Sequence, residues 1–222
     1  MIDFIFMFTR HDQTVEDCLA TFEAIKEVGV RHLGFKDVGV ERETLRELNR
    51  RIKASGAVSY MEVVSTTSED CLNSARTAVD IGVDRLLGGT EVETILSLLQ
   101  GSGIEYMPFP GRPEGHPTKL GGTPQEVADH CRRFVQLGCA GVDLLAYRAT
   151  EADPLDLVRA ARGATDGTLV VAGSVDSPER IKDLEAAGAD AFTIGSAAFD
   201  GSFSPRKGLL ASQLSDILAA CR

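Results

Sequence analysis

TLVVAGSVDSPERIKDLEAAGADAFTIGSAAFDG, residues 168–201, is the stretch from which the fold can be worked out. The apolar run 169–172 is typical of a buried strand, and it stops at Gly173-Ser174. Ser177-Pro178 then predicts a helix start, with a serine cap followed by proline at the first helical position. A second apolar run, 191–194, stops at Gly195-Ser196. The stretch therefore predicts a strand–helix–strand unit in which both strands end in Gly-Ser.

The rest of the chain repeats this unit. Six junctions place a glycine directly before an apolar run, as the end of a helix followed at once by a strand: VGVRHLGF, SGAVSYMEV, IGVDRLLGG, SGIEYMPF, GVDLLAY and AGADAFTIG. The predicted strands are residues 3–8, 30–35, 58–64, 84–87, 104–109, 142–147, 169–172 and 191–194. The count predicts an α/β protein, a (β/α)8 TIM barrel of eight parallel strands that forms one domain over residues 1–222. An open doubly wound sheet would need glycines after the first strand, where Thr9-Arg10-His11-Asp12-Gln13 has none.

Capping signals predict the helix starts. Thr14 with Asp17, Thr67 or Ser68, Thr90, and Thr123 with Pro124 and Glu126 each precede a helical pattern. Further helices are expected over residues 42–54, 154–162 and 208–220.

The two Gly-Ser steps also indicate chemistry. Glycine lets a backbone approach a ligand closely, and free N–H groups at a strand end or helix start can hold an anion. Gly173, Ser174, Gly195 and Ser196 are therefore candidate phosphate ligands, although the glycines could instead simply end the strands. The stretch resembles the closing strands of the phosphate-binding (β/α)8 barrels of the ribulose-phosphate-binding and histidine–tryptophan biosynthesis type. That resemblance implies a phosphorylated substrate.

Composition excludes several classes of partner. The formal net charge of −10 argues against a nucleic-acid or membrane surface, which would need basic patches. Five cysteines without paired spacing predict no metal site and fit reduced thiols in a cytoplasmic protein. Residues 1–9 are apolar but include Asp3 and no basic residue before it, so they are interpreted as the first strand. We expect no cofactor, and assembly into a homo-oligomer stays open.

In such a barrel, function resides at the carboxyl ends of the strands. Lys36 ends the second predicted strand and Glu62 lies in the third, so they could form a neighbouring pair. Lys36 could be a Schiff-base nucleophile or a charged group, and Asp37 beside it would favour the charged form. The same pair could also be only a structural ion pair.

Other strand ends add candidates. Asp12 and Asp143 are candidate catalytic carboxylates, and Arg10 and Arg148 are candidate ligands for substrate oxygens. The loop 110–122, PGRPEGHPTKLGG, is too rich in glycine and proline for a helix, and it could be an active-site lid or a disordered surface loop. Its Arg112, His116 and Lys119 could bring positive charge onto a phosphate.

The sequence lacks several motifs of the enzymes that it resembles, so the reaction stays open. Aldolases of the oxo-acid phosphogluconate type carry a Schiff-base lysine on strand six, which has none here, and the Asp-x-Lys-x-x-Asp motif of the decarboxylases is absent. The metal-binding His and Asp set of the pentose-phosphate epimerases is also missing. The favoured hypothesis is an enzyme acting on a phosphorylated sugar or oxo-acid, as a carbon–carbon lyase or by related enolisation, with Lys36 as amine or acid and Glu62 as proton carrier. The alternatives are an isomerase using Asp12 and Asp143, a flavin-phosphate-binding oxidoreductase, and a non-catalytic binding barrel.

Overall fold

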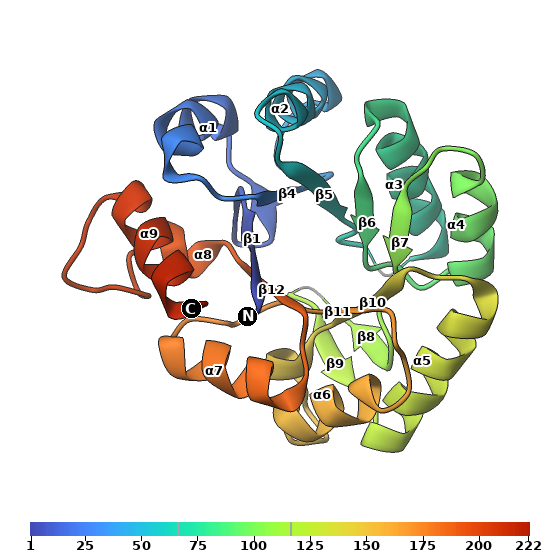
Figure 1. The fold of residues 1–222 in the computed structure, drawn as a ribbon. Helices are drawn as coiled ribbons and strands as arrows, with labels where there is room; N and C mark the ends of the chain where they lie inside the picture. Colours follow the sequence, from blue (N-terminus) through green and yellow to red (C-terminus); the bar gives the residue numbers. More distant parts are fainter. Residues whose placement is uncertain (66, 116) are drawn as a thin grey trace.

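The computed structural model describes residues 1–65, 67–115 and 117–222. Eight parallel strands form its central sheet: β1 (Asp3–Met7), β4 (His32–Lys36), β5 (Val58–Glu62), β6 (Arg85–Leu87), β7 (Glu105–Met107), β10 (Gly141–Leu144), β11 (Thr168–Val171) and β12 (Ala191–Ile194). The helices surround the sheet in Figure 1: α1 (Cys18–Ile25), α2 (Arg42–Ala54), α3 (Ser68–Ile81), α4 (Val92–Leu99), α5 (Pro124–Leu137), α6 (Pro154–Arg162), α7 (Pro178–Ala187), α8 (Ser196–Phe199) and α9 (Leu210–Ala220). Two short 3₁₀ helices, η1 (Lys26–Val28) and η2 (Ala146–Arg148), complete the regular helical structure of the described residues.

The sheet curls into a nearly closed barrel. Its strand order is β10-β11-β12-β1-β4-β5-β6-β7, and every pairing between these neighbours is parallel. Between the two outer strands, the Ala140 N–H donates to the Tyr106 carbonyl and the Asp143 N–H donates to the Pro108 carbonyl, each over 3.0 Å. The predicted barrel is confirmed, with a weaker seam between β7 and β10.

Alternation along the strands separates two apolar cores. The larger core packs the outward-facing side chains, such as Phe6, Phe35 and Phe192, against the helices. A smaller cluster fills the barrel interior with side chains that include Ile5, Met7 and Tyr60. Gly34 makes room for this filling, since a Cβ there would lie 2.4 Å from the Met7 sulfur.

Most helix boundaries follow the capping signals. Thr67 accepts a hydrogen bond from the Asp70 N–H ahead of α3, and Thr123 with Glu126 forms a complete capping box ahead of α5. The start of α1 was predicted wrongly, because Asp17 is the N-cap and Thr14 belongs to a strand. The chain uses that segment for an antiparallel hairpin of β2 (Thr9–Arg10) and β3 (Gln13–Thr14).

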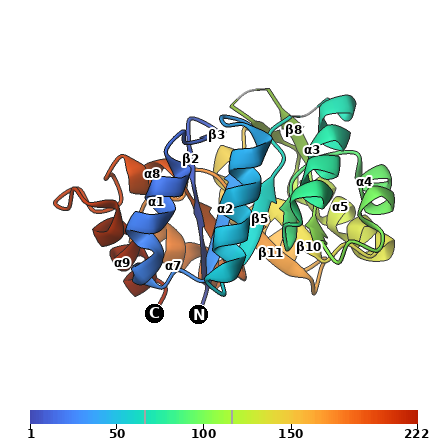
Figure 2. The same ribbon diagram turned by 90° about the horizontal axis from the view of Figure 1, so that it is seen from above.

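A second hairpin, β8 (Arg112–Glu114) with β9 (Lys119–Gly121), occupies the loop 110–122. Figure 2 shows β2, β3 and β8 at the end of the barrel opposite the two chain termini, which is the end where the strands have their carboxyl ends. Both hairpins therefore stand over the barrel mouth. Among the described residues, no helix combines the length and the apolar character that a bilayer crossing requires.

Candidate active site at the barrel mouth

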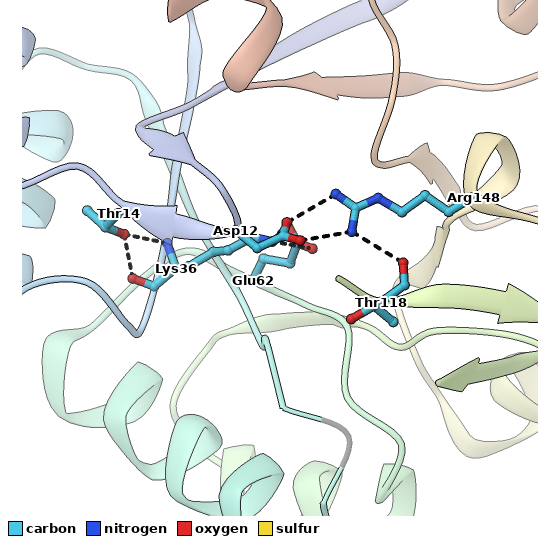
Figure 3. A network of polar contacts seen from close by, with 6 residues as sticks. All are labelled: Asp12, Thr14, Lys36, Glu62, Thr118 and Arg148. Carbon is cyan, nitrogen blue, oxygen red and sulfur yellow. Dashed lines mark hydrogen bonds and ion pairs between the residues drawn. The ribbon is translucent and has the colours of Figure 1, made fainter. Parts of the chain in front are cut away.

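Asp12 is held over the barrel mouth by the first hairpin. His11 and Asp12 are the two turn residues between β2 and β3, and both have left-handed backbones, with φ of 50° and 59°. Such two-residue hairpin turns require positive φ at both positions. The turn directs the Asp12 carboxylate toward Lys36 and Arg148 (Figure 3).

Lys36 ends β4 and lies between two carboxylates. Its Nζ is 2.8 Å from Asp12 Oδ1 and 3.4 Å from Glu62 Oε1, and its side chain is 7% exposed. The pairing with Glu62 follows from the sheet, because Lys36 and Glu62 are register partners on β4 and β5. The predicted neighbouring pair is present. Asp37 does not take part in it, because its carboxylate accepts a hydrogen bond from Ser74 instead.

The charges of this cluster oppose the effect of burial. Burial disfavours the ammonium form of Lys36, but the negative charges of Glu62 and Asp12 outweigh it and raise the Lys36 pKa. Burial likewise disfavours ionised Asp12, but hydrogen bonds from Arg148 and the charge of Lys36 lower the Asp12 pKa well below its ordinary value. Lys36 is thus a cation and Asp12 an anion at neutral pH. This arrangement favours a fixed charge over a neutral amine nucleophile.

Thr14 fixes the backbone under Lys36. Its hydroxyl donates to the Lys36 carbonyl over 2.7 Å and accepts from the Lys36 N–H over 2.9 Å (Figure 3). The Thr14 residue is 2% exposed. The sequence predicted Thr14 to be a helix cap. No local pattern around Thr14 indicates its hydrogen bonds to the Lys36 backbone.

Arg148, in η2, binds the other side of Asp12. Its guanidinium forms a two-pronged contact, with Nη1 at 3.2 Å from Oδ2 and Nη2 at 3.0 Å from Oδ1, and Nη1 also donates to the Thr118 carbonyl over 3.3 Å. The Arg148 side chain crosses Gly173 so closely that a Cβ there would lie 2.4 Å from Nε. Gly173 therefore has a packing role as well as a place at the strand end.

Asp143 lies on β10 near this cluster but is fully buried. Neither carboxyl oxygen has a hydrogen-bond partner in the described part of the chain. Burial raises its pKa well above the ordinary range, and the nearby charge of Glu62 adds to the rise. The residue does not line the open cavity beside Lys36.

The cavity beside Lys36, called the inner cavity below, has a volume of about 320 Å³. Lys36 and Glu62 form one side of it, and the two Gly-Ser steps form another, together with Asp12, Arg148 and Thr193. Two further acids line it, but Asp176 is paired with Arg180, and Asp200 with Arg10. All four predicted phosphate ligands, Gly173, Ser174, Gly195 and Ser196, meet at this cavity.

The backbone at the Gly-Ser steps supports an anion site. Ser196 and Ala197 begin α8, where the first N–H groups have no partner within the helix. Ser174 has a left-handed φ of 59° after Gly173 at 79°. Over residues 1–65, 67–115 and 117–222, the only non-glycine residues with positive φ are His11, Asp12 and Ser174. Since unfavourable backbone conformations concentrate at functional sites, their gathering here makes this mouth the candidate site.

Gly195 has a different reason to be glycine. A Cβ at this position would lie 2.6 Å from the Thr9 hydroxyl and 2.7 Å from the Thr9 carbonyl. A bulky side chain would thus displace the β2 backbone. A substitution at Gly195 would therefore disturb packing as well as any contact with a phosphate, and it could not separate the two effects.

A second cavity of about 440 Å³, called the outer cavity, adjoins the first. Asp12, Arg148, Ser174 and Ser196 line both cavities, while His11, Thr118, Lys119 and Tyr147 line only the outer one. Lys119 therefore lies on the outer side of the Gly-Ser steps and shares a cavity with Ser174 and Ser196. Arg10 lines neither cavity and pairs with Asp200.

The loop 110–122 is ordered against the site where it is described. Thr118 contacts Arg148, whereas Arg112 is paired with Glu126 and Glu151 and lines neither cavity. His116 lies outside the described residues. No cluster of three His, Cys, Asp or Glu side chains suited to a metal ion occurs in the described ranges. Of the cysteines, all five are free thiols, four of them buried, as the composition predicted.

Solved structures share this fold. No protein family matches the sequence, and no curated protein does so either. The native KDPGal structure is 14% identical and aligns over 99% of this chain and 93% of its own, with a TM-score of 0.67. The N-acetylmannosamine-6-phosphate 2-epimerase from Clostridium perfringens is 11% identical, covering 97% of this chain and 93% of that one, at 0.65. Thiamine phosphate pyrophosphorylase from Pyrococcus furiosus is 10% identical, covering 98% and 96%, at 0.64. The resemblance to phosphate-binding (β/α)8 barrels is confirmed at the level of the fold.

Proposed function

We propose that this protein is an enzyme that cleaves or forms a carbon–carbon bond in a small phosphorylated sugar or oxo-acid, through an enolate. The observation that carries the proposal is the position of Lys36. Its ammonium lies within 2.8 Å of Asp12 and 3.4 Å of Glu62, at a cavity that the two Gly-Ser steps also line. Two of the similar structures are named for phosphorylated compounds, which agrees with a phosphate at this mouth.

In the proposed orientation, the phosphate accepts hydrogen bonds from the free N–H groups at Ser174, Ser196 and their neighbours. The substrate carbonyl oxygen then faces Lys36. A preorganised cation at the position where negative charge develops stabilises an enolate without rearrangement of the site.

Glu62 is assigned the proton transfer. In cleavage, its carboxylate accepts the proton of the substrate hydroxyl, and the bond between that carbinol carbon and the neighbouring carbon breaks. The hydroxyl-bearing fragment leaves as a carbonyl compound, and the electron pair enters the enolate. Glu62 then returns the proton to the enolate carbon, so that atoms and charge balance.

The geometry favours this proposal over the carboxylate isomerase. Asp12 is bound by two cations, which makes it a weak base, and Asp143 does not line the inner cavity. It also favours charged Lys36 over an imine, because two carboxylates hold its proton.

The test is turnover of a panel of phosphorylated ketoses and oxo-acids by the wild type, Lys36→Ala and Glu62→Gln. We expect each substitution to lower kcat by about 10²–10⁴-fold, the usual range for one electrostatic or acid–base group. Borohydride trapping with an active substrate, read by mass spectrometry, separates the two roles of lysine. An adduct on Lys36 would replace the electrostatic role with an imine, while no turnover of any panel member by the wild type would refute the proposed function.

A further inference from the structure

The two cavities meet at the Asp12–Arg148 ion pair. Asp12, Arg148, Ser174 and Ser196 belong to the walls of both, so a ligand seated on the Gly-Ser steps lies next to the outer cavity. The outer cavity is large enough for several further heavy atoms, and the polar side chains of Thr118, Tyr147 and Thr150 contribute to its walls. The proposed chemistry, at Lys36 and Glu62, makes no use of this space.

The charge of the outer cavity is cationic in an otherwise acidic protein. Lys119 lines it and has no acidic partner within the described chain, although most other lysines and arginines are paired. Arg148 adds a second cation to this wall, and its guanidinium is paired with Asp12, which also binds Lys36. The chain carries a net charge of −10, so a lysine on this wall stands out, although Glu114 is its register partner on β8.

Arg148 already binds the carboxylate of Asp12 through a two-pronged contact. Its two Nη atoms contact the two oxygens of Asp12 at 3.0 and 3.2 Å, the fork-to-fork arrangement that arginine uses for carboxylates and phosphates. Asp12 is also bound by Lys36, so it would still have a partner after a rotation of Arg148. Arg148 can thus exchange Asp12 for an anion from the ligand without leaving Asp12 unpaired.

We propose that the outer cavity is a second anionic subsite and that the substrate carries two anionic groups. One is the phosphate on the Gly-Ser steps, and the other is a carboxylate bound by Lys119 and Arg148. This inference rests on the proposed function and narrows it to phosphorylated acids. A carboxylate suits the subsite better than a second phosphate, because the planar fork of Arg148 is already matched to one.

The experiment compares two probes by isothermal calorimetry. Glycerol 3-phosphate carries a phosphate only, and 3-phosphoglycerate carries a phosphate and a carboxylate on the same three-carbon frame. We expect 3-phosphoglycerate to bind the wild type about tenfold more tightly, since a charge-assisted pair with Lys119 is added. Lys119→Gln removes that advantage, and the affinity for glycerol 3-phosphate changes by less than about twofold.

Lys26→Gln is the matched control, because Lys26 is an exposed lysine in η1 and pairs with Glu23 away from both cavities. It changes net charge equally and leaves the ratio of the two affinities intact. Equal affinities for the two probes in the wild type, or an equal loss of both in Lys119→Gln, overturn the second subsite and leave the phosphate site standing. Binding of neither probe overturns the phosphate site of the proposed function together with the subsite.

Discussion

Asp143 is a fully buried carboxyl group with no hydrogen-bond partner among the described residues. Its folded pKa is raised, so between the unfolded value near 4 and the folded value the native state binds the additional proton. Stability contributed at this position is therefore greatest at low pH and decreases as pH rises. The Asp143→Asn substitution replaces the carboxyl group with an amide of the same shape that does not titrate.

We expect the free energy of unfolding of Asp143→Asn, relative to wild type, to increase with pH by up to about 1.4 kcal/mol per pH unit. Urea titrations between about pH 5 and pH 8 measure this trend. Asp156→Asn, on exposed α6, is the control and should show little dependence. A difference that stays constant with pH would mean that Asp143 is ionised in the native protein.

At the other end of the barrel, the pKa of His32 is lowered, so its effect on stability has the opposite pH dependence. Burial lowers its pKa, and the charge of Arg85 assists, while Asp3 opposes the change. Its Nδ1 lies 2.9 Å from the Tyr60 hydroxyl, inside the barrel. The unfolded chain takes up the proton first as pH falls, so this contribution to stability is present above about pH 6.5 and is lost below it.

His32→Gln should therefore flatten the loss of stability between about pH 7 and pH 5. Thermal unfolding across that range gives the measurement. His11→Gln, at the exposed hairpin turn, is the matched control. An unchanged pH profile in His32→Gln would show that the native protein accepts the charged imidazolium.

At the scale of elements, a hydroxyl of the hairpin β2–β3 holds the backbone at the end of β4, beside the Asp12–Lys36 ion pair and the hydrogen bond from the Thr14 N–H to the Val38 carbonyl. Thr14 makes both a donor and an acceptor contact to the Lys36 backbone, and no strand ladder replaces them at that point. Thr14→Val keeps the volume but leaves a buried N–H and carbonyl unsatisfied, which costs about 1–3 kcal/mol. We expect this loss in chemical denaturation, together with lower kcat, because Lys36 loses its fixed position.

Thr21→Val on α1 provides the comparison. Thr21 is also buried, and its hydroxyl makes no hydrogen bond within the described residues. Its substitution should cost less than about 1 kcal/mol. Equal costs for the two variants would mean that the Thr14 contacts do not hold β4.

Elements with strong local signals could be predicted from the sequence. The helices α6 and α7 begin and end at the expected residues, because proline, capping side chains and glycine act within one turn. The pairing of Lys36 with Glu62 was also accessible, since adjacent parallel strands align their carboxyl ends.

The remaining parts of the site depend on contacts between distant segments. The turn at His11-Asp12 lacks the Asn-Gly or Asp-Gly pair that usually marks such a hairpin, so Thr14 was interpreted as a cap. Likewise, Arg148 meets Asp12 across 136 positions of the sequence, and the packing of Arg148 on Gly173 has no local signature. Short α8 escaped prediction because four residues give no helical periodicity.

At the scale of the whole molecule, the barrel has one weak seam. Strands β7 and β10 share two hydrogen bonds from Ala140 and Asp143, whereas β1 and β12 are paired over four register positions. Local opening follows the least stabilised contacts. We expect the amides of Ala140 and Asp143 to exchange with deuterium at least about tenfold faster than those of Phe6 and Phe192.

Hydrogen exchange followed by NMR resolves these amides. The comparison is internal to one sample, so solvent conditions are the same for all four. Equal protection at the seam and at the β1–β12 ladder would indicate that the barrel opens only by global unfolding.

The left-handed backbone of Ser174 has a consequence for the evolution and engineering of this protein. A non-glycine residue in that conformation costs about 1–3 kcal/mol, and glycine at the same position removes most of the cost. Selection for heat resistance alone would accept Ser174→Gly early, and His11→Gly for the same reason. Under the proposed function, selection for turnover would retain the original residues, because Ser174 lines both cavities and His11 lines the outer one. Libraries screened on both criteria should therefore separate into stabilised and active lineages at these two positions.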